Sequence, residues 1–218
     1  VGGDAAFGGV STDSRSAPAG ALFVALRGET FDAHDFLDQV AARGVAAVVA
    51  ERLPQGWTLP AIVVPNTLTA LGQIANSWRR QYDLPLIGVT GSNGKTTVKE
   101  MIASILAAAF GSDGRLATQG NLNNEIGVPL TVMRLQDSHR AAVVELGMNH
   151  PGEIAPLSRM ARPHVAMITT VAPAHMEAFG SLEGIAVEKA SIFEGLEPAG
   201  PSVARWANLP PKIGRAHV

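Results

Sequence analysis

Short apolar runs alternate with helical patterns along the first third of the chain. The runs are typical of buried strands because no polar residue interrupts them. They cover residues 21–26, 45–50 and 61–64. A helical pattern over residues 34–43 ends at Gly44, and Asn66 can cap a second helix over residues 67–82. This alternation of strands and helices predicts an α/β domain.

A second α/β pattern follows the loop-like residues 83–85. Residues 86–90 predict a strand that leads through a glycine-rich turn into a helix over residues 96–110. The expected apolar face of that helix consists of Val98, Ile102, Ile105, Leu106 and Ala109. Further strands are predicted at residues 141–146 and 165–171, and a further helix at residues 181–196. We therefore expect one domain over residues 1–84 and a second, with a mostly parallel sheet, over residues 85–200.

Composition narrows the classes of partner. Of the 218 residues, 46% are hydrophobic and 17% are charged, as in ordinary globular proteins, and the formal net charge is -2. No basic excess favours a nucleic acid or a membrane surface as partner. Cysteine is absent, which excludes disulfides and thiolate chemistry. The longest apolar stretch, residues 101–110, is far shorter than the roughly 18 residues of a membrane span.

Both ends of the sequence are unusual. The chain opens without an initiator methionine, in the loop-like VGGDAAFGG, so we expect a truncated start. Residues 201–218 show neither a strand nor a helix period, and residues 213–218 (IGRAHV) match the translation of a common sequencing adapter. We expect residues 201–218 to be a non-native tail without functional residues.

The strongest motif is GVTGSNGKTT, residues 88–97, between a predicted strand and a predicted helix. In this setting, backbone N–H groups and the helix N-terminus face phosphate oxygens. Lys95 would reach the β- and γ-phosphates of ATP, and the Thr96 hydroxyl would ligate Mg²⁺. The predicted nucleotide-binding residues are Gly91, Ser92, Asn93, Gly94, Lys95, Thr96 and Thr97. Kinases, ATPases and ligases share such loops, so the motif leaves the reaction open.

Charged and amide side chains supply further candidates. Glu145 ends an apolar strand, at the sheet edge where α/β proteins bind ligands, and is either a Mg²⁺ ligand or a solvated carboxylate. Lys189 lies on the apolar stripe of its helix, so it is either a functional buried amine or a lysine whose head reaches solvent. Asn121, Asn123 and Asn124 can bind sugar or peptide groups, or stabilise their own turn.

Val89 stands where the general phosphate-loop template has glycine, and with this departure the loop resembles that of the Mur ligase and folylpolyglutamate synthetase superfamily. Further segments resemble the Mur ligase family more narrowly and extend from about residue 11 to residue 200. They are STDSR (11–15), LFVALRG (22–28), DAHDF (32–36), VKEM (98–101), GNLNNEIGVP (120–129), VELGMNHPGEI (144–154) and AHMEAFG (174–180). Residues 121–129 and 145–150 are most similar to the family members that add D-alanyl-D-alanine.

The resemblance implies a fold and an activity. It implies a UDP-muramyl-peptide-binding domain over residues 1–84 and an incomplete, Rossmann-like ATP-binding domain over residues 85–200. The implied enzyme is an ATP- and Mg²⁺-dependent ligase that joins D-alanyl-D-alanine to UDP-N-acetylmuramoyl-tripeptide through an acyl phosphate. Peptidoglycan precursor synthesis of this kind is cytoplasmic, and we expect a monomer.

The resemblance also assigns residues. The implied catalytic set is Lys95, Glu145, His175 and Lys189. Mg²⁺ would be held by Thr96, Glu145, His175 and Lys189, the lysine after carbamylation by CO₂. Substrate would be bound by Thr12, Asp13, Ser14, Arg15, Asn121, Asn123, Asn124, Asn149 and His150. Arg15 suits a diphosphate, because a guanidinium pairs well with phosphate oxygens.

Other functions remain open at this level. A sister ligase would add diaminopimelate or lysine instead, whereas folylpolyglutamate synthetase fits less well because a substrate domain precedes the phosphate loop. A protein of another class would bind nucleotide or UDP-sugar without ligation. Because the family's later domains are not represented, we expect the chain as given to bind its substrates without turning them over.

Overall fold

The computed structural model describes residues 2–174 and 176–197, so His175 and the expected tail lie outside the described residues. The chain divides into two compact units, Val1–Ile74 (unit 1) and Ala75–Val218 (unit 2). The division between the units falls within a helix, ten residues before the boundary that the sequence suggests. Among the described residues, none of the helices has the length and hydropathy that a bilayer crossing requires.

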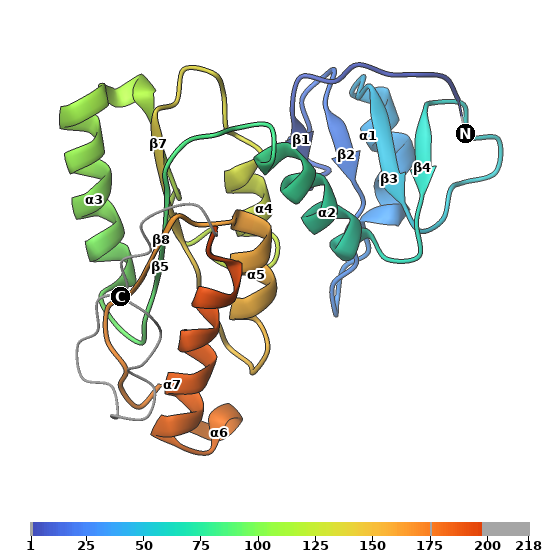
Figure 1. Cartoon of the computed structure of the whole chain (residues 1–218). Coiled ribbons are helices and arrows are strands. Elements are labelled where there is room, and N and C mark those ends of the chain that lie inside the picture. The colour runs from blue at the N-terminus through green and yellow to red at the C-terminus, as the bar shows by residue number, and fades with distance from the viewer. Residues whose placement is uncertain (1, 175, 198–218) are drawn as a thin grey trace. The chain divides into compact units, whose positions relative to one another are not determined.

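Unit 1 is built on a parallel sheet in the order β1-β2-β3-β4 (Figure 1). Its strands are β1 (Val10–Ser11), β2 (Leu22–Val24), β3 (Ala47–Ala50) and β4 (Ala61–Val63). A 3₁₀ turn, η1 (Ala33–Phe36), precedes α1 (Leu37–Ala42), so the predicted helix over residues 34–43 begins one turn late. The core combines both element types, with Phe23, Leu37, Val40 and Val48 fully buried.

Helix α2 (Thr67–Arg79) spans the boundary between the two units. It begins where the sequence predicts, because Asn66 Oδ1 accepts a hydrogen bond from the Thr69 N–H at 2.7 Å. The Glu51 carboxylate accepts a second backbone bond, from the Thr67 N–H at 3.1 Å. Two of the unpaired N–H groups at this helix end are thereby satisfied.

Unit 2 contains a second parallel sheet, in the order β6-β7-β5-β8. Its strands are β5 (Leu86–Thr90), β6 (Arg115–Ala117), β7 (Ala141–Glu145) and β8 (Val165–Ile168). The helices are α3 (Lys95–Phe110), α4 (Gly127–Val132), α5 (Ile154–Ala161), α6 (Met176–Phe179) and α7 (Leu182–Ala190), with 3₁₀ turns η2 (Ser112–Gly114) and η3 (Ser191–Gly195). Because β5 lies between β7 and β8, the loops that follow these three strands meet at one sheet edge.

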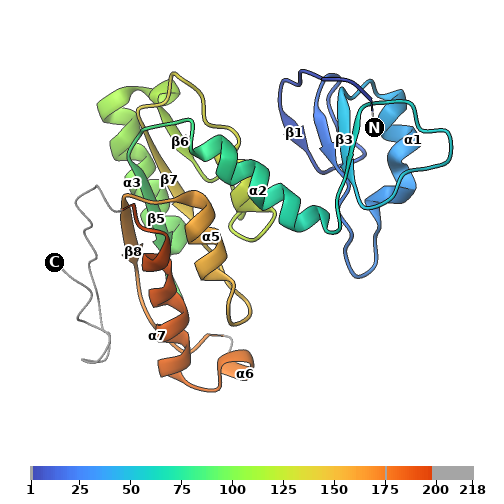
Figure 2. The same cartoon turned by 45° about the vertical axis from the view of Figure 1, so that its right-hand side comes forward.

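The sheet of unit 2 is buried on both faces. Val89 and Val143 pack with α3 on one face, whereas Leu86 and Val144 belong to a larger core with α4, α5, α7 and η3. Figures 1 and 2 show α3 on one side of the strands and α5 on the other. Strands that are covered on both faces read as continuous apolar runs, which explains why the sequence identifies them well.

Two expectations for the helices of unit 2 are wrong in detail. Val98, Ile102 and Leu106 of α3 pack against the core as predicted, but Ile105 is 67% exposed and Ala109 is also exposed. The buried residues of α3 are Lys99 and Ala103, so the buried face is shifted from the one that apolar residues alone suggest. The predicted helix over residues 181–196 ends at Ala190 and continues as η3, where the Ser158 hydroxyl donates a short hydrogen bond to the carbonyl of Ile192.

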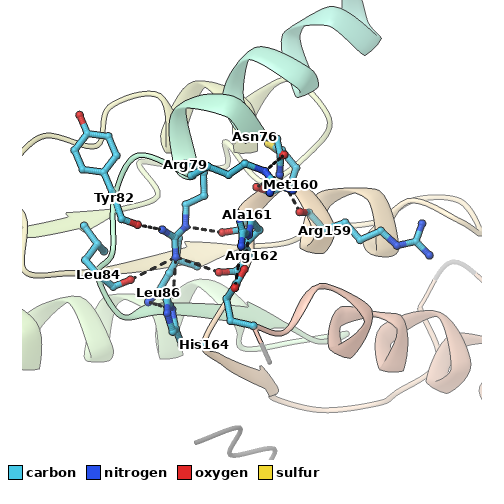
Figure 3. A network of polar contacts seen from close by, with 12 residues as sticks. Asn76, Arg79, Tyr82, Leu84, Leu86, Arg159, Met160, Ala161, Arg162 and His164 are labelled. Atoms are coloured by element: carbon cyan, nitrogen blue, oxygen red, sulfur yellow. Dashed lines mark hydrogen bonds and ion pairs between the residues drawn. The ribbon is translucent and has the colours of Figure 1, made fainter. Parts of the chain in front are cut away.

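A buried arginine joins the start of unit 2 to the end of α5 (Figure 3). Arg79 is 3% exposed, and its guanidinium donates to the carbonyl oxygens of Ala161 (2.9 Å), Tyr82 (2.5 Å) and Arg162 (3.1 Å). A longer bond of 3.4 Å reaches the carbonyl of Leu84. Burial lowers the pKa of Arg79, and these carbonyls replace the solvation that its charge loses.

Candidate functional site

The phosphate loop connects the central strand β5 to α3, as predicted. Gly91 and Gly94 have φ angles of +151° and +76°, which residues with a side chain rarely adopt. Gly94 is the N-cap of α3, and Lys95 is its first residue. The Lys95 ammonium donates to the Gly91 carbonyl at 2.9 Å, which holds it over the turn. The exposed Thr96 lies on the first turn of α3.

The segment after β8 holds the phosphate loop in shape. The Ser92 N–H donates to the Thr170 carbonyl at 2.8 Å, and the Ser92 hydroxyl donates to the Ala172 carbonyl at 2.9 Å. The Thr169 hydroxyl donates to the Asn93 carbonyl at 2.6 Å. A Cβ on Gly91 would lie 2.0 Å from Thr169 Oγ1, so only glycine fits at this contact. The loop is thus preorganised by its neighbouring strand.

Glu145 lies at the end of β7, in register with Val89 of β5. It is 1% exposed, and its Oε1 accepts a hydrogen bond from Asn123 Nδ2 at 2.8 Å. Its Oε2 is buried and has no hydrogen-bond partner in the described structure. A buried carboxylate oxygen without a donor suits a cation, because an isolated buried charge is costly.

The three asparagines of the predicted substrate loop have different surroundings. The Asn123 side chain holds Glu145, and the Asn124 side chain caps α4 by accepting from the N–H groups of Ile126 and Gly127. Asn121 is exposed, and its carbonyl accepts from the Asn123 N–H at 2.8 Å. Asn121 and Asn124 are exposed, whereas Asn123 is half-buried.

Lys189 is buried on α7, as its position on the apolar stripe predicts. The residue is 2% exposed, and the pKa of its amine is lowered from 10.5 to about 8. Burial is the largest cause and the positive charge of Lys95 the second, whereas Glu188 raises this pKa. Because the charge of Lys95 affects the pKa of Lys189, the ammonium group on α7 interacts electrostatically with the phosphate loop.

Two carboxylates fix the loop that follows β7. Glu153 Oε2 accepts from the N–H groups of Asn149 (2.6 Å) and His150 (3.1 Å), both of which are exposed. Glu188, next to Lys189, accepts from the N–H groups of Gly152 (2.7 Å) and Ile154 (2.9 Å). This loop is thereby tied to the helix that carries the buried lysine.

The predicted substrate residues of unit 1 gather at a hollow of about 390 Å³, lined by Thr12, Asp13, Ser14, Arg15 and Phe31. Arg15 forms a bidentate pair with Asp13, with N–O distances of 2.9 and 2.8 Å. Hydrogen bonds from Arg15 lower the pKa of Asp13 to about 2. Ser14 is buried, whereas the side chain of Arg15 is 84% exposed.

Sequence reasoning missed several residues of the site. Thr118 is buried after β6, and its hydroxyl accepts from the Glu145 N–H at 2.9 Å. Thr169 and Thr170 fall inside the strand predicted over residues 165–171, but β8 ends at Ile168, so both residues follow the strand at the sheet edge. Nothing in the sequence indicated the contact of Glu188. Within residues 2–174 and 176–197, no group of three His, Cys, Asp or Glu residues lies close enough to hold a metal ion.

The fold and the loop define a class of protein. A parallel sheet, a central strand and a Gly-Ser-Asn-Gly-Lys-Thr turn at a helix N-terminus are the features of a P-loop nucleotide-binding α/β protein. Comparison with known families narrows the class. Residues 89–209 match the Mur ligase middle domain, and residues 7–79 match the Mur ligase family catalytic domain. The chain belongs to the Mur ligase family.

Two proteins that are similar to this chain have the same name. The chain is 44% identical to UDP-N-acetylmuramoyl-tripeptide--D-alanyl-D-alanine ligase of Escherichia coli (strain K12), over 100% of this chain and 48% of that protein. The corresponding ligase of Haemophilus influenzae is 45% identical over 89% of this chain and 43% of its own length. The chain therefore spans about half the length of these relatives.

Solved structures agree with these relatives. A crystal structure of MurF from Acinetobacter baumannii superposes with a TM-score of 0.83 and 43% identity, covering 89% of this chain and 42% of that one. MurF from Thermotoga maritima in complex with ADP gives a TM-score of 0.80 and 32% identity, covering 90% of this chain and 45% of that one. The α/β fold class expected from the sequence is confirmed.

Proposed function

We propose that this chain is part of an ATP-dependent ligase that adds D-alanyl-D-alanine to UDP-N-acetylmuramoyl-tripeptide in peptidoglycan precursor synthesis. The observation that carries the proposal is the convergence at one sheet edge of the Lys95 loop and Glu145, with Lys189 coupled to Lys95. In the first step, the substrate carboxylate takes the γ-phosphoryl group of ATP, forming an acyl phosphate, and ADP leaves. The amine of D-alanyl-D-alanine then attacks the acyl carbon, the bond to phosphate breaks, and phosphate and the amine proton are released.

Phosphoryl transfer depends mainly on positioning and charge neutralisation, and the residues supply both. Lys95 exchanges its bond with the Gly91 carbonyl for phosphate oxygens, and the N–H groups of residues 91–97 orient them. The backbone bond from the Ser92 N–H to the Thr170 carbonyl keeps this loop in its binding shape before nucleotide arrives.

Thr96 and Glu145 fit a bound Mg²⁺. Glu145 offers the buried Oε2 that has no partner among the described residues, and Thr96 offers an exposed hydroxyl at the start of α3. Hydroxyl and carboxylate oxygens are the ligands that Mg²⁺ prefers. When bound, Mg²⁺ neutralises charge on the transferring phosphate. We assign His175 to the same ligand set on family resemblance alone.

Lys189 has the properties that carbamylation requires. Only the neutral amine reacts: its nitrogen forms a bond to the carbon of CO₂, one C–O π bond breaks, and a proton passes to solvent. A pKa of about 8 instead of 10.5 raises the neutral fraction at pH 7 by about two orders of magnitude. The product is an anion beside Lys95, so the two side chains no longer repel each other.

Unit 1 is proposed to bind the UDP-muramyl part of the substrate. Arg15 is exposed at the hollow after β1 and can pair with a diphosphate. The exposed candidates for peptide contacts in unit 2 are Asn121, Asn124, Asn149 and His150. We also propose that residues 1–84 form the UDP-muramyl-peptide-binding domain and residues 85–200 the ATP-binding domain. The protein is proposed to be a cytoplasmic monomer.

An acceptor assay tests the activity. The intact protein that carries this chain would receive ATP and Mg²⁺ in separate reactions. One reaction contains D-alanyl-D-alanine and UDP-N-acetylmuramoyl-tripeptide. The others contain diaminopimelate, lysine or glutamate, each with the acyl substrate to which that amino acid is added. We expect phosphate release with D-alanyl-D-alanine and none in the Lys95→Ala variant. Turnover with diaminopimelate or lysine alone would identify a sister ligase, and turnover with glutamate alone would contradict the muramyl assignment.

A further inference from the structure

A hollow of about 740 Å³ lies along β6, the edge strand of the sheet in unit 2, and the proposed function assigns no ligand to it. Its lining extends from Ser112, before the strand, to Gly120, after it. Residues of the loop between α4 and β7 also line it. Most of the lining side chains are polar, so the hollow is suited to a small polar ligand.

The cationic groups of this hollow lie toward the amino ends of the strands. Arg115 is the first residue of β6, and His139 belongs to the loop that leads into β7. The strands β5, β6 and β7 are parallel, so their amino ends lie at one edge of the sheet. The phosphate loop with Lys95 follows the carboxyl end of β5, at the opposite edge. The cationic end of the hollow is therefore separate from the nucleotide site.

The guanidinium of Arg115 contains a donor that the protein does not satisfy. Its Nε is buried and has no hydrogen-bond partner within the described residues. A buried N–H without an acceptor is unfavourable, and the cost is larger when the group is charged. An oxyanion is a suitable partner, because two of its oxygens can accept parallel hydrogen bonds from one guanidinium.

His139 supplies a second donor, and Arg134 supplies a second charge. His139 Nδ1 accepts a hydrogen bond from the Gln136 N–H at 2.9 Å, so the neutral ring carries its proton on Nε2. Burial and then the positive charge of Arg134 lower the pKa of His139. Because the ring and the guanidinium interact and both line the hollow, both can act on one ligand.

The backbone holds the two walls of the cationic end together. The Arg140 N–H donates to the carbonyl of Gly114 at 2.7 Å, so the loop before β7 is tied to the turn before β6. A Cβ on Gly114 would lie 2.9 Å from the Cβ of Phe110, which makes this turn tight. Groups that are positioned before a ligand arrives lose little conformational entropy when it binds.

Two carboxylates also line the hollow, but they do not cancel its positive charge. Glu100 Oε1 pairs with the ammonium of Lys99, which is fully buried. Asp113 is exposed on η2, where solvent and salt screen its charge. The hollow therefore has two arginines against one carboxylate that no lysine neutralises, and this balance favours a negatively charged ligand.

We propose that this hollow is a second anion site, separate from the phosphate loop, which binds a small molecule through phosphate or carboxylate oxygens. Arg115 and Arg134 contribute the charge, and His139 donates a hydrogen bond from Nε2. The polar groups toward Gly120 contact the uncharged remainder of the ligand. The site goes beyond the proposed ligase activity and does not depend on it.

Nuclear magnetic resonance of the histidine rings tests the proposal, with inorganic phosphate and citrate as probes. The Lys95→Ala chain is used throughout, because it lacks the cation of the phosphate loop. Among the six histidines, the signal of His139 is the one that His139→Gln removes. We expect at least one probe to shift this signal saturably and to raise the pKa of His139, because a bound anion stabilises the charged ring. Tighter binding of phosphate or of citrate identifies the type of oxyanion.

Substitutions that remove one charge each locate the site. Arg115→Gln and Arg134→Gln should each weaken binding of the probe about tenfold. Arg140→Gln is the matched control, because Arg140 is an exposed neighbour that does not line the hollow, and it should change the affinity less than about threefold. Arg134 is exposed, so its replacement tests the site even where Arg115→Gln disturbs folding.

Three results would overturn the proposal. A His139 signal that neither phosphate nor citrate moves would exclude the site. Binding that is unchanged in both Arg115→Gln and Arg134→Gln would place the anion elsewhere. Equal losses in these two variants and in Arg140→Gln would indicate a general attraction to positive charge.

Discussion

Replacing Lys189 by methionine should make the folded chain more stable at neutral pH. Lys189 is 2% exposed, and burial followed by the charge of Lys95 lowers its pKa from 10.5 to about 8. One pKa unit corresponds to about 1.36 kcal/mol, so holding the ammonium in the folded state costs about 3 kcal/mol. Methionine has a similar length and no charge, so it removes this cost.

The pH dependence follows from the direction of the pKa change. Below pH 8 the amine is protonated in both the folded and the unfolded chain, and the full cost is present. Between pH 8 and 10.5 the unfolded chain binds the proton and the folded chain does not, so stability rises with pH. The advantage of Lys189→Met should therefore be about 3 kcal/mol at pH 7 and should shrink as the pH approaches 10.5.

Urea unfolding of both proteins from pH 7 to pH 10, in buffers free of CO₂, measures this difference. The contributions of the other titrating groups are the same in the unaltered chain and in the variant, so they cancel in the difference of the unfolding free energies. In a Lys95→Met background the gain should be smaller but still present, because burial is the larger cause of the lowered pKa. A Lys189→Met chain that is no more stable at pH 7, with a difference independent of pH, would refute the reasoning.

Three further substitutions test other contacts. Gly91→Ala places a Cβ 2.0 Å from Thr169 Oγ1, so ATP affinity measured by titration should fall at least tenfold; unchanged affinity would contradict the tight loop contact. Arg79→Met removes the donor from four carbonyls and should lower the free energy of unfolding in urea by about 2–4 kcal/mol. Arg80→Met, at an exposed neighbour, should change it by no more than about 0.5 kcal/mol. Asn123→Ala frees Glu145 Oε1 and should weaken Mg²⁺-ATP binding, measured by calorimetry; equal affinity would exclude a positioning role.

Buried strands and the phosphate loop are the parts of this fold that sequence reasoning identifies best. The strand at residues 86–90 has the bounds of β5, because both faces of the sheet are covered and the run carries no charged residue. The helix predicted from residue 181 begins at Leu182, and Ser181 is its N-cap, with its hydroxyl accepting from the Gly184 N–H at 3.0 Å. Such local signals act within a few residues and therefore appear in the sequence.

Contacts between distant segments could not be predicted in the same way. The face of α3 turns toward Lys99, a buried ammonium whose side chain pairs with Glu100, so a rule that places only apolar residues inside fails there. Glu188 and Ile154 are 34 residues apart, and their bond depends on how α7 packs beside α5. Lys189 could be predicted to be buried because it lies at helical spacing from apolar residues, and the structure does bury it.

Binding of ATP at the β5 loop is the central claim, and calorimetric titration of the 218-residue chain with ATP and Mg²⁺ tests it most directly. We expect the unaltered chain to bind one ATP, and Lys95→Ala to bind at least tenfold more weakly because the cation at the phosphates is lost. Phe7→Leu, at an exposed residue of unit 1, should bind as the unaltered chain does. An unaltered chain that binds no ATP, or a Lys95→Ala variant with equal affinity, would contradict the account.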